Sequence, residues 1–163
     1  MTSAVRQWVE GEASTPVERV VEAASDWPAV SLAPHAYDGV EFRLGDYEVG
    51  HVHHGWESVH VNYPRRMRDA LIAAGRTSAH PYFSDSGWTS RRLSTPEDVE
   101  PALWLLRVAY LYRSLTRRGK PEGRAVLESV DVVRELEDLE PGEPVRGLFD
   151  EVVDARSLRA VGP

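Results

Sequence analysis

Residues 39–62 read GVEFRLGDYEVGHVHHGWESVHVN, and this stretch decides the fold class because apolar and polar residues alternate along it. Alternation with a period of two is typical of β-strands that bury one face. The Gly45–Asp46 pair fits a two-residue hairpin turn between two such strands. One face of the first strand is expected to carry Val40, Phe42 and Leu44, with Glu41 and Arg43 on the other. We predict an antiparallel meander whose strands cover residues 30–36, 39–44, 47–54 and 57–62.

Helical patterns flank this meander on both sides. Thr15, Pro16 and Glu18 form a capping box with proline at the first helical position, which predicts a helix that ends near Trp27. Strands flanked by helices indicate an α+β fold, with a single antiparallel sheet of about four to five strands and helices packed on one face. Two further helices are expected at residues 64–75 and 95–119, and a last short strand is expected between them at residues 88–93.

The chain divides into three parts by composition. Residues 1–14 are polar and are expected to form a flexible N-terminus, and residues 15–119 form the α+β domain. Residues 120–163 are expected to form a helical C-terminal extension, with one helix at 122–138 and a short helical segment at 147–155. The extension is acidic and rich in leucine and valine, so it also offers a surface through which the chain could form a homo-oligomer.

Length and charge exclude several classes of protein. The 163 residues suit one domain with a tail, and the absence of cysteine excludes disulfides and thiolate metal sites. A formal net charge of −7 argues against nucleic acid as a partner, because phosphate binding needs a basic face. There is no signal-peptide pattern and no run of 18 apolar residues. We therefore expect a soluble cytoplasmic protein with no membrane partner.

Three histidines lie within four positions of the third predicted strand, in the segment GHVHHGWE. Alternate residues of a strand share a face, so His51 and His53 are expected to point the same way, beside Tyr47 and Val49. His54 is expected to point to the opposite side. Two neutral imidazoles on one face can serve as a general base or as hydrogen-bond donors to a substrate.

The same segment matches the first half of the cupin metal-binding pattern, through Gly45, His51, His53 and Glu57. The second half of that pattern, with its additional histidine, is absent, and a cupin needs about eight strands. Two imidazoles and one carboxylate are also an incomplete ligand set, with no second shell visible in the sequence to orient them. The prediction is therefore that no metal and no other cofactor is bound tightly. A purely structural pairing of the histidines with Glu57, Asp85 or the backbone stays open as an alternative.

The segment AHPYFSDSGW, residues 79–88, has no periodicity and is expected to be a loop rich in hydrogen-bonding groups. Binding and catalytic residues concentrate in such loops, which makes His80 a further candidate. A Ser-His-Asp triad composed of Ser86, His80 and Asp85 is a weaker alternative, because the segment lacks the strand–turn–helix context of a nucleophilic serine.

Three blocks together resemble the luciferase-like domain family, the small domain shared with fungal luciferases. They are GVEFRLGDYEVGHVH, YPRRMRDALIAAGRTSAHPYFSDSGWTSRRL and EDVEPALWLLRVAYLY, and they place the resemblance over residues 16–116. The chain departs from the family pattern at His54, which precedes the glycine that often follows the second histidine. The order of elements is also similar, by topology alone, to MmcQ/YjbR-like domains.

The resemblance implies a small-molecule pocket and a possible oxidoreductase activity: oxygen addition to an electron-rich hydroxypyrone, without metal or flavin. Such chemistry needs a base, donors that hold an anion, and a dry aromatic pocket. The alternative is a module that binds a small molecule or a protein without chemistry. The expected catalytic residues are His51, His53 and His80. The residues expected to bind the substrate are Arg65, Arg66, Tyr82, Asp85, Ser86, Trp88 and Trp56.

Overall fold

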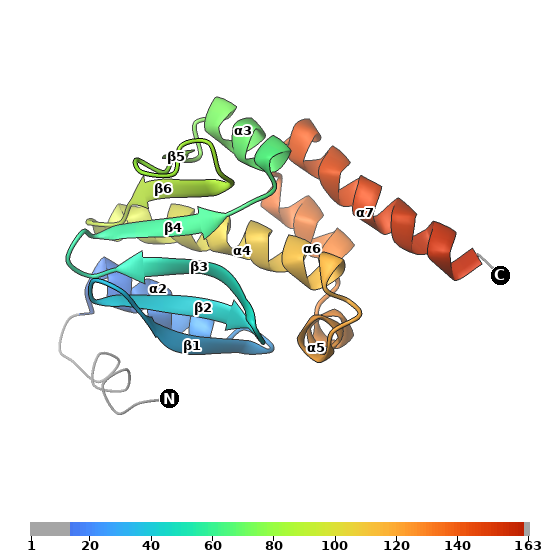
Figure 1. The fold of residues 1–163 in the computed structure, drawn as a ribbon, viewed down its shortest axis with the longest axis horizontal. Helices are drawn as coiled ribbons and strands as arrows, with labels where there is room; N and C mark the ends of the chain where they lie inside the picture. The colour runs from blue at the N-terminus through green and yellow to red at the C-terminus, as the bar shows by residue number, and fades with distance from the viewer. Residues whose placement is uncertain (1–13, 162–163) are drawn as a thin grey trace.

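The computed structural model describes residues 14–161, with side chains described as far as Asp154. The flexible N-terminus expected at residues 1–14 lies outside the described residues, apart from Ser14. The protein is an α+β fold with a single antiparallel sheet, as predicted, and the sheet has six strands in the order β1-β2-β3-β4-β6-β5, against the four to five expected (Figure 1). The strands are β1 (Val30–His35), β2 (Gly39–Leu44), β3 (Tyr47–His53), β4 (Ser58–Asn62), β5 (Ser78–Ala79) and β6 (Trp88–Arg92).

The meander predicted from residues 30–62 is present with strand ends within two residues of those expected. Gly45 opens the β2–β3 turn with a φ of 65°, a conformation that glycine adopts without steric cost. Strand β5 is an addition to the prediction. It has only two residues, which pair with Thr89 and Ser90 at the edge of the sheet, so it is too short to show any alternation.

Helices α2 (Pro16–Ser25) and α4 (Val99–Thr116) cover one face of the sheet (Figure 1). The capping box of α2 is formed, since the backbone N–H of Glu18 donates to Thr15 Oγ1 over 3.1 Å. A 3₁₀ turn, η1 (Pro96–Asp98), precedes α4, and α3 (Arg65–Ala73) connects β4 to β5. The core between sheet and helices contains Val20, Val40, Phe42, Leu44, Val52, Val59, Val61, Leu71, Leu105 and Leu106.

The C-terminal extension is helical, as predicted, but its helix boundaries differ. The expected helix at 122–138 is divided into α5 (Pro121–Ser129) and α6 (Val132–Leu139). The break lies at Val130, whose backbone is extended, and Asp131 then caps α6 by accepting from the backbone N–H of Arg134. Helix α7 (Glu143–Val161) is longer than the predicted segment at 147–155, because Pro144 lies in its first turn, where proline is tolerated.

The extension packs against the domain rather than trailing from it. Val126, Leu136, Val145 and Phe149 belong to the same buried core as the sheet. Helix α4 is therefore buried on most of its circumference, between the sheet and the extension, and this explains why apolar residues occur all round it.

A β-bulge in β3 corrects one prediction about which residues share a face. Phe42 pairs with Gly50 and Arg43 pairs with Glu48, so Val49 is an extra residue on β3. After the bulge, Gly50 and Val52 face the helices, and a Cβ at Gly50 would lie only 2.9 Å from Leu106 Cδ2. Because a bulge shifts the alternation by one residue, neither Tyr47 nor Val49 shares a face with His51. Val49 is buried in the core, and the ring of Tyr47 lies against Arg113 of α4.

Candidate functional site

A pocket of about 560 Å³ lies on the side of the sheet that the helices leave uncovered. The histidines point into it because their strand neighbours Val52, Val59 and Val61 point into the core, and successive strand residues face opposite ways. Strands β1, β3 and β4 and the segment after β5 each supply histidine. The five imidazoles that line the pocket are His35, His51, His53, His60 and His80.

Aromatic rings form the rest of the wall. Trp88 begins β6, and the rings of Tyr37, Trp56, Tyr82 and Phe83 come from three loops. These four loop rings are 56–81% exposed, and Val133 is the only other large apolar residue so exposed among those described. Exposed apolar groups that gather around one cavity make it a candidate binding site, whereas scattered exposed residues would not.

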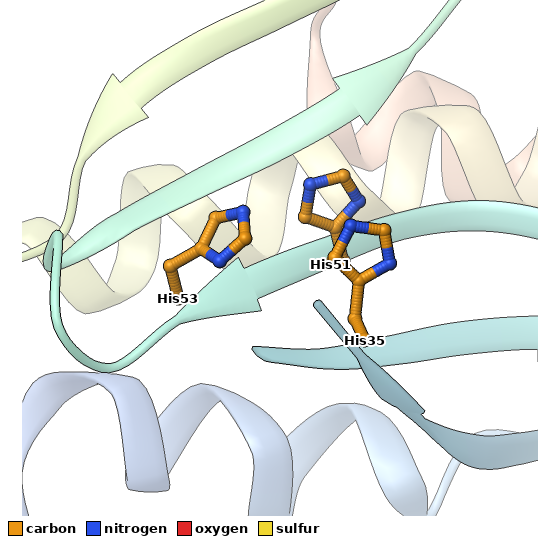
Figure 2. A group of neighbouring side chains, drawn as sticks. All are labelled: His35, His51 and His53. Carbon is orange, nitrogen blue, oxygen red and sulfur yellow. The ribbon is translucent and has the colours of Figure 1, made fainter. Parts of the chain in front are cut away.

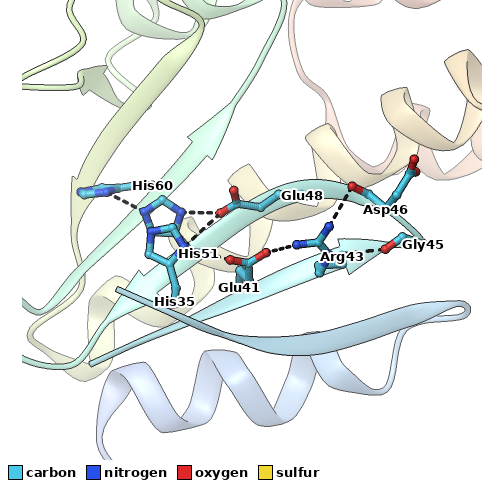
Figure 3. Close-up of polar contacts among 8 residues, drawn as sticks. All are labelled: His35, Glu41, Arg43, Gly45, Asp46, Glu48, His51 and His60. Atoms are coloured by element: carbon cyan, nitrogen blue, oxygen red, sulfur yellow. Dashed lines mark hydrogen bonds and ion pairs between the residues drawn. The ribbon is translucent and has the colours of Figure 1, made fainter. Parts of the chain in front are cut away.

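Two of the imidazoles are each hydrogen-bonded to a carboxylate (Figure 3). Nδ1 of His51 lies 2.6 Å from Glu48 Oε1, and Nδ1 of His35 lies 3.0 Å from Glu41 Oε1. Because a carboxylate only accepts, both Nδ1 atoms carry the proton in these contacts, and both Nε2 atoms hold a lone pair. Arg43 in turn donates to Glu41 and holds that carboxylate in place.

Hydrogen bonds also assign the tautomers of two further histidines. Nε2 of His51 accepts from Nδ1 of His60 over 3.1 Å, so a chain of contacts runs from Glu48 through His51 to His60. Nδ1 of His80 accepts from the backbone N–H of Tyr82 over 3.1 Å. Neutral His80 therefore carries its proton on Nε2 and is a hydrogen-bond donor, whereas His35 and His51 are acceptors at Nε2.

His53 differs from the other four imidazoles. Its side chain is nearly completely buried, and its Nδ1 has no hydrogen-bond partner of normal geometry within the described part of the chain, although the nearby backbone of Tyr37 acts to raise the pKa of the ring. It lies edge-on to His51, with ring centroids 4.8 Å apart (Figure 2). A buried nitrogen without a partner loses the hydrogen bond that water would give it in the unfolded chain. Such an atom either lowers the stability of the fold or binds a ligand that supplies the missing partner.

Burial favours the neutral form of three of the pocket histidines. Burial, reinforced by the His51 ring, lowers the pKa of His53 to about 4. Burial and the same neighbour lower the pKa of His60 to about 3, and burial lowers the pKa of His80. Burial also raises the pKa of Glu41, but hydrogen bonds from His35 and Arg43 outweigh burial and keep that carboxylate ionised.

The structure brings six of the ten predicted site residues together in this pocket. They are His51, His53, His80, Trp56, Tyr82 and Trp88. His54, expected to point away, lies in the turn after β3 and is not part of the lining.

The four other predicted site residues are not part of the pocket lining. Arg65 donates to the backbone carbonyl of Asp85, and Arg66 lies 3.3 Å from Glu151 on α7. The hydroxyl of Ser86 donates to the carbonyl of Phe83 over 2.6 Å and accepts from the backbone N–H of Trp88. Arg65 and Ser86 therefore hold the loop that carries Tyr82 and Phe83. Direct contact of a ligand with any of the four residues outside the lining, Arg65, Arg66, Asp85 and Ser86, stays a prediction.

Sequence reasoning missed His35, His60, Tyr37 and the two carboxylates. Alternation was sufficient to find His60, because it lies between two valines, Val59 and Val61. His51 and His53 alternate with Val52 in the same way. His35 and Tyr37 carried no such signal. Their place depends on the pairing of β1 with β2 and on a turn in which Tyr37 and Asp38 both have positive φ, at 59° and 56°.

Among the residues that the structure describes, two groups of side chains are close enough to hold a metal ion. One ring nitrogen from each of His35, His51 and His53 lies within 4.8 Å of the others, and His35, Glu41 and Glu48 form a second group with the same spacing. A cupin site is not formed, because the sheet is open and Glu57 is exposed in the turn between β3 and β4.

Comparison with known proteins supports the resemblance for part of the chain. The family model described as "Luciferase domain" matches residues 46–109, which include β3, β4, α3, β5, β6 and most of α4. Four of the five pocket histidines fall in this range, and His35 precedes it. Neither the curated proteins nor the solved structures gave a significant match. Within residues 14–161, no helix has both the length and the apolar character needed to cross a membrane.

Proposed function

We propose that the luciferase-like domain of this chain binds a small aromatic or enolisable molecule in the histidine pocket and removes a proton from it, as the first step of an oxygen-dependent oxidation. The observation that carries the proposal is the convergence of five imidazoles and five aromatic rings on one pocket of about 560 Å³. This volume lies in the range of small-molecule sites, which are mostly apolar with a few well-placed polar groups.

The hydrogen bonds of the imidazoles suit an acidic enol or phenol. His35 and His51 have a carboxylate on Nδ1 and an acceptor at Nε2, the arrangement of a general base. His80 presents a donor on Nε2, which can hold the resulting anion. The rings of Trp56 and Trp88 can stack on a flat substrate and exclude water from it.

The oxidation needs only dioxygen as co-reactant. Loss of the enol proton to an imidazole gives an electron-rich enolate, which passes one electron to dioxygen. The two radicals then combine through a new C–O bond, and the peroxide anion takes the proton back from the imidazolium. The product is a hydroperoxide that contains all atoms of the substrate and of dioxygen.

A hydroxypyrone is the appropriate probe, because the family resemblance implies this class of compound. Binding is followed by tryptophan fluorescence and oxygen uptake by an electrode, both in EDTA. We expect saturable binding and oxygen uptake, and loss of uptake in His51→Gln with binding retained. Arg134→Ala is the matched control, since Arg134 is exposed on α6 and is not part of the pocket lining. Absence of binding at millimolar probe would contradict the proposal.

A second candidate function is binding without chemistry. It is favoured by the exposure of Tyr37 and Tyr82, which are 74% and 81% exposed at the pocket rim and offer stacking surface to a ligand. Saturable binding of the probe with no oxygen uptake by the wild-type protein would select this function over the oxidase.

A further inference from the structure

We infer that His35, His51 and His53 form a binding site for a divalent transition metal such as Zn²⁺, with three imidazole ligands and a remaining position open to the pocket. The three rings converge from the end of β1 and from β3 (Figure 2). One nitrogen from each lies within 4.8 Å of the other two. Three imidazoles and an open fourth position are a common ligand set of catalytic zinc.

The second shell of this site is already in place. Metal-bound histidines nearly always donate their other ring N–H to a carboxylate or carbonyl, which fixes the tautomer and the ring orientation. Glu41 occupies that position on His35 at 3.0 Å, and Glu48 occupies it on His51 at 2.6 Å. These contacts leave the lone pairs of both Nε2 atoms for a metal. A bound ion would occupy the nitrogens that act as the base in the proposed function, which therefore uses the metal-free pocket. The sequence-based expectation of no tightly bound metal relied on the lack of such a shell, and the fold supplies it.

His53 provides the third ligand. Its Nδ1 is buried and has no hydrogen-bond partner in the described residues, as expected for a nitrogen kept for a metal. The two carboxylates also place negative charge beside a dication. Glu48 lies 3.7 Å from His35 Nδ1 as well as 2.6 Å from His51 Nδ1, so it adjoins both ligands.

Binding requires a small adjustment of the rings. Zn–N bonds of about 2.0–2.1 Å place tetrahedral ligand nitrogens about 3.3 Å apart, which is shorter than the 4.8 Å limit of the present cluster. The rings of His35 and His51 now stack at 3.7 Å and must tilt to direct their lone pairs at one ion. His35 is able to tilt, because it is the last residue of β1 and its side chain is 24% exposed. The ion would also take the place of the His60 N–H group, whose hydrogen bond His51 Nε2 now accepts.

The test is a calorimetric titration of untagged, EDTA-treated and desalted protein with Zn²⁺ alone. We expect one ion per chain with a dissociation constant in the micromolar range or tighter. His35→Ala and His53→Ala should weaken binding about 100-fold or more, and Glu48→Gln about 10- to 100-fold, as for other second-shell carboxylates. His54→Ala is the matched control, because it removes an adjacent imidazole that is not in the cluster, and it should leave the affinity unchanged.

Circular dichroism in EDTA checks that each variant is folded. If His53→Ala is not folded, the affinities of His35→Ala and Glu48→Gln for Zn²⁺ test the inference, since both substitutions lie at less buried positions. Visible absorption of bound Co²⁺ gives an independent readout of coordination. No Zn²⁺ binding at micromolar concentration, or equal affinity in His35→Ala and the wild type, overturns the inference. The titration contains no probe and the hydroxypyrone assay contains EDTA, so the metal site and the proposed function can fail separately.

Discussion

The two faces of the sheet differ in what the fold does with their side chains. On the helix face, Val52, Val61 and Leu106 are completely or almost completely buried and fill the core. On the pocket face, the same strands carry His51 and His60, which are also buried but are surrounded by other imidazoles and by exposed aromatic rings. The helix face therefore stabilises the fold through burial of apolar side chains. The pocket face carries buried polar side chains, which apolar burial does not explain.

This contrast is the basis of the proposal that the histidine face serves binding or chemistry. Buried polar groups generally cost stability unless all their hydrogen bonds are made. Nδ1 of His53 is without a partner among the described residues, and burial lowers the pKa values of His53 and His60 far below the usual range of histidine. Substitutions on the two faces should therefore have opposite profiles: loss of stability on one, and loss of function with little loss of stability on the other.

The largest effect on stability is expected from Leu106→Ala. Leu106 is completely buried and touches the backbone of β3 at Gly50, where no side chain intervenes. Removal of a buried leucine side chain costs about 2–5 kcal/mol, because transfer energy is lost and a cavity is left. Urea unfolding followed by circular dichroism measures this, and a loss below about 1 kcal/mol would show that α4 does not anchor the sheet there.

The largest effect on function at unchanged stability is expected from His53→Gln. Glutamine approximates the size of histidine and keeps a donor, but it removes an imidazole from the pocket. His53 packs edge-on against His51, the base of the proposed function, so its replacement should displace that base. We expect a loss of oxygen uptake with the hydroxypyrone of about 100-fold, the usual contribution of an acid–base group, and a nearly unchanged melting temperature.

His54→Gln is the matched control for that substitution, because His54 lies one position further, in the turn after β3. It should be close to neutral in oxygen uptake. If His54→Gln impaired uptake and His53→Gln did not, the assignment of faces would be wrong. If both variants lowered the melting temperature strongly, the histidines would be structural.

A smaller effect is expected from Trp56→Ala, which removes one exposed ring from the pocket rim. An aromatic stacking contact contributes about 0.5–1.5 kcal/mol beyond its area, so the affinity for the probe should fall about 3- to 10-fold. The loss should appear in the dissociation constant and not in the unfolding free energy. Unchanged affinity would place the probe elsewhere than under Trp56.

The smallest effect is expected from Asp98→Asn on the helix side. The carboxylate of Asp98 accepts from the backbone N–H groups of Ser94 and Thr95, each over 2.9 Å. Burial raises the pKa of Asp98, but these bonds outweigh it and lower the pKa to about 2. A lowered folded-state pKa gives stability that is present above pH 3.8 and is lost as the pH falls toward 2.

Asp98→Asn should therefore cost about 1 kcal/mol at neutral pH and less below pH 3, because the variant has no carboxylate to protonate. Denaturant unfolding at both pH values measures the difference. An equal cost at both would show that the charge of Asp98 does not contribute.

The sequence was sufficient to predict the α+β class and the meander, because period-two alternation depends on local residues only. The common pocket of His53, His80 and Trp88 could be expected from the family resemblance alone, which places the histidine strand and the loop that ends at Trp88 in one block. The bulge at Val49 could not be predicted, since one extra residue leaves the apolar pattern of β3 intact and changes only its pairing with β2. For the same reason Val49 was placed on the wrong face.

The contribution of His35, Glu41 and Glu48 to the pocket could not be predicted from the sequence for a different reason. His35 reaches the pocket through the β1–β2 pairing, and nothing in the local residues indicates that its ring will stack on His51. Glu41 was placed correctly on the face opposite Phe42, but its hydrogen bond to His35 depends on that same pairing. The division of residues 1–14, 15–119 and 120–163 into separate units stays a prediction, although the extension shares the core of the domain.

The most direct test of the account is long-range ¹H–¹⁵N NMR of the six imidazoles in EDTA, during titration with the hydroxypyrone. Before addition, His51 and His60 should carry their protons on Nδ1 and His80 on Nε2. The probe should then shift the ring nitrogens of the five pocket histidines and leave those of His54 in place. Shifts confined to His54, or saturable binding that moves none of the five, would contradict the assignment of this face as the functional site.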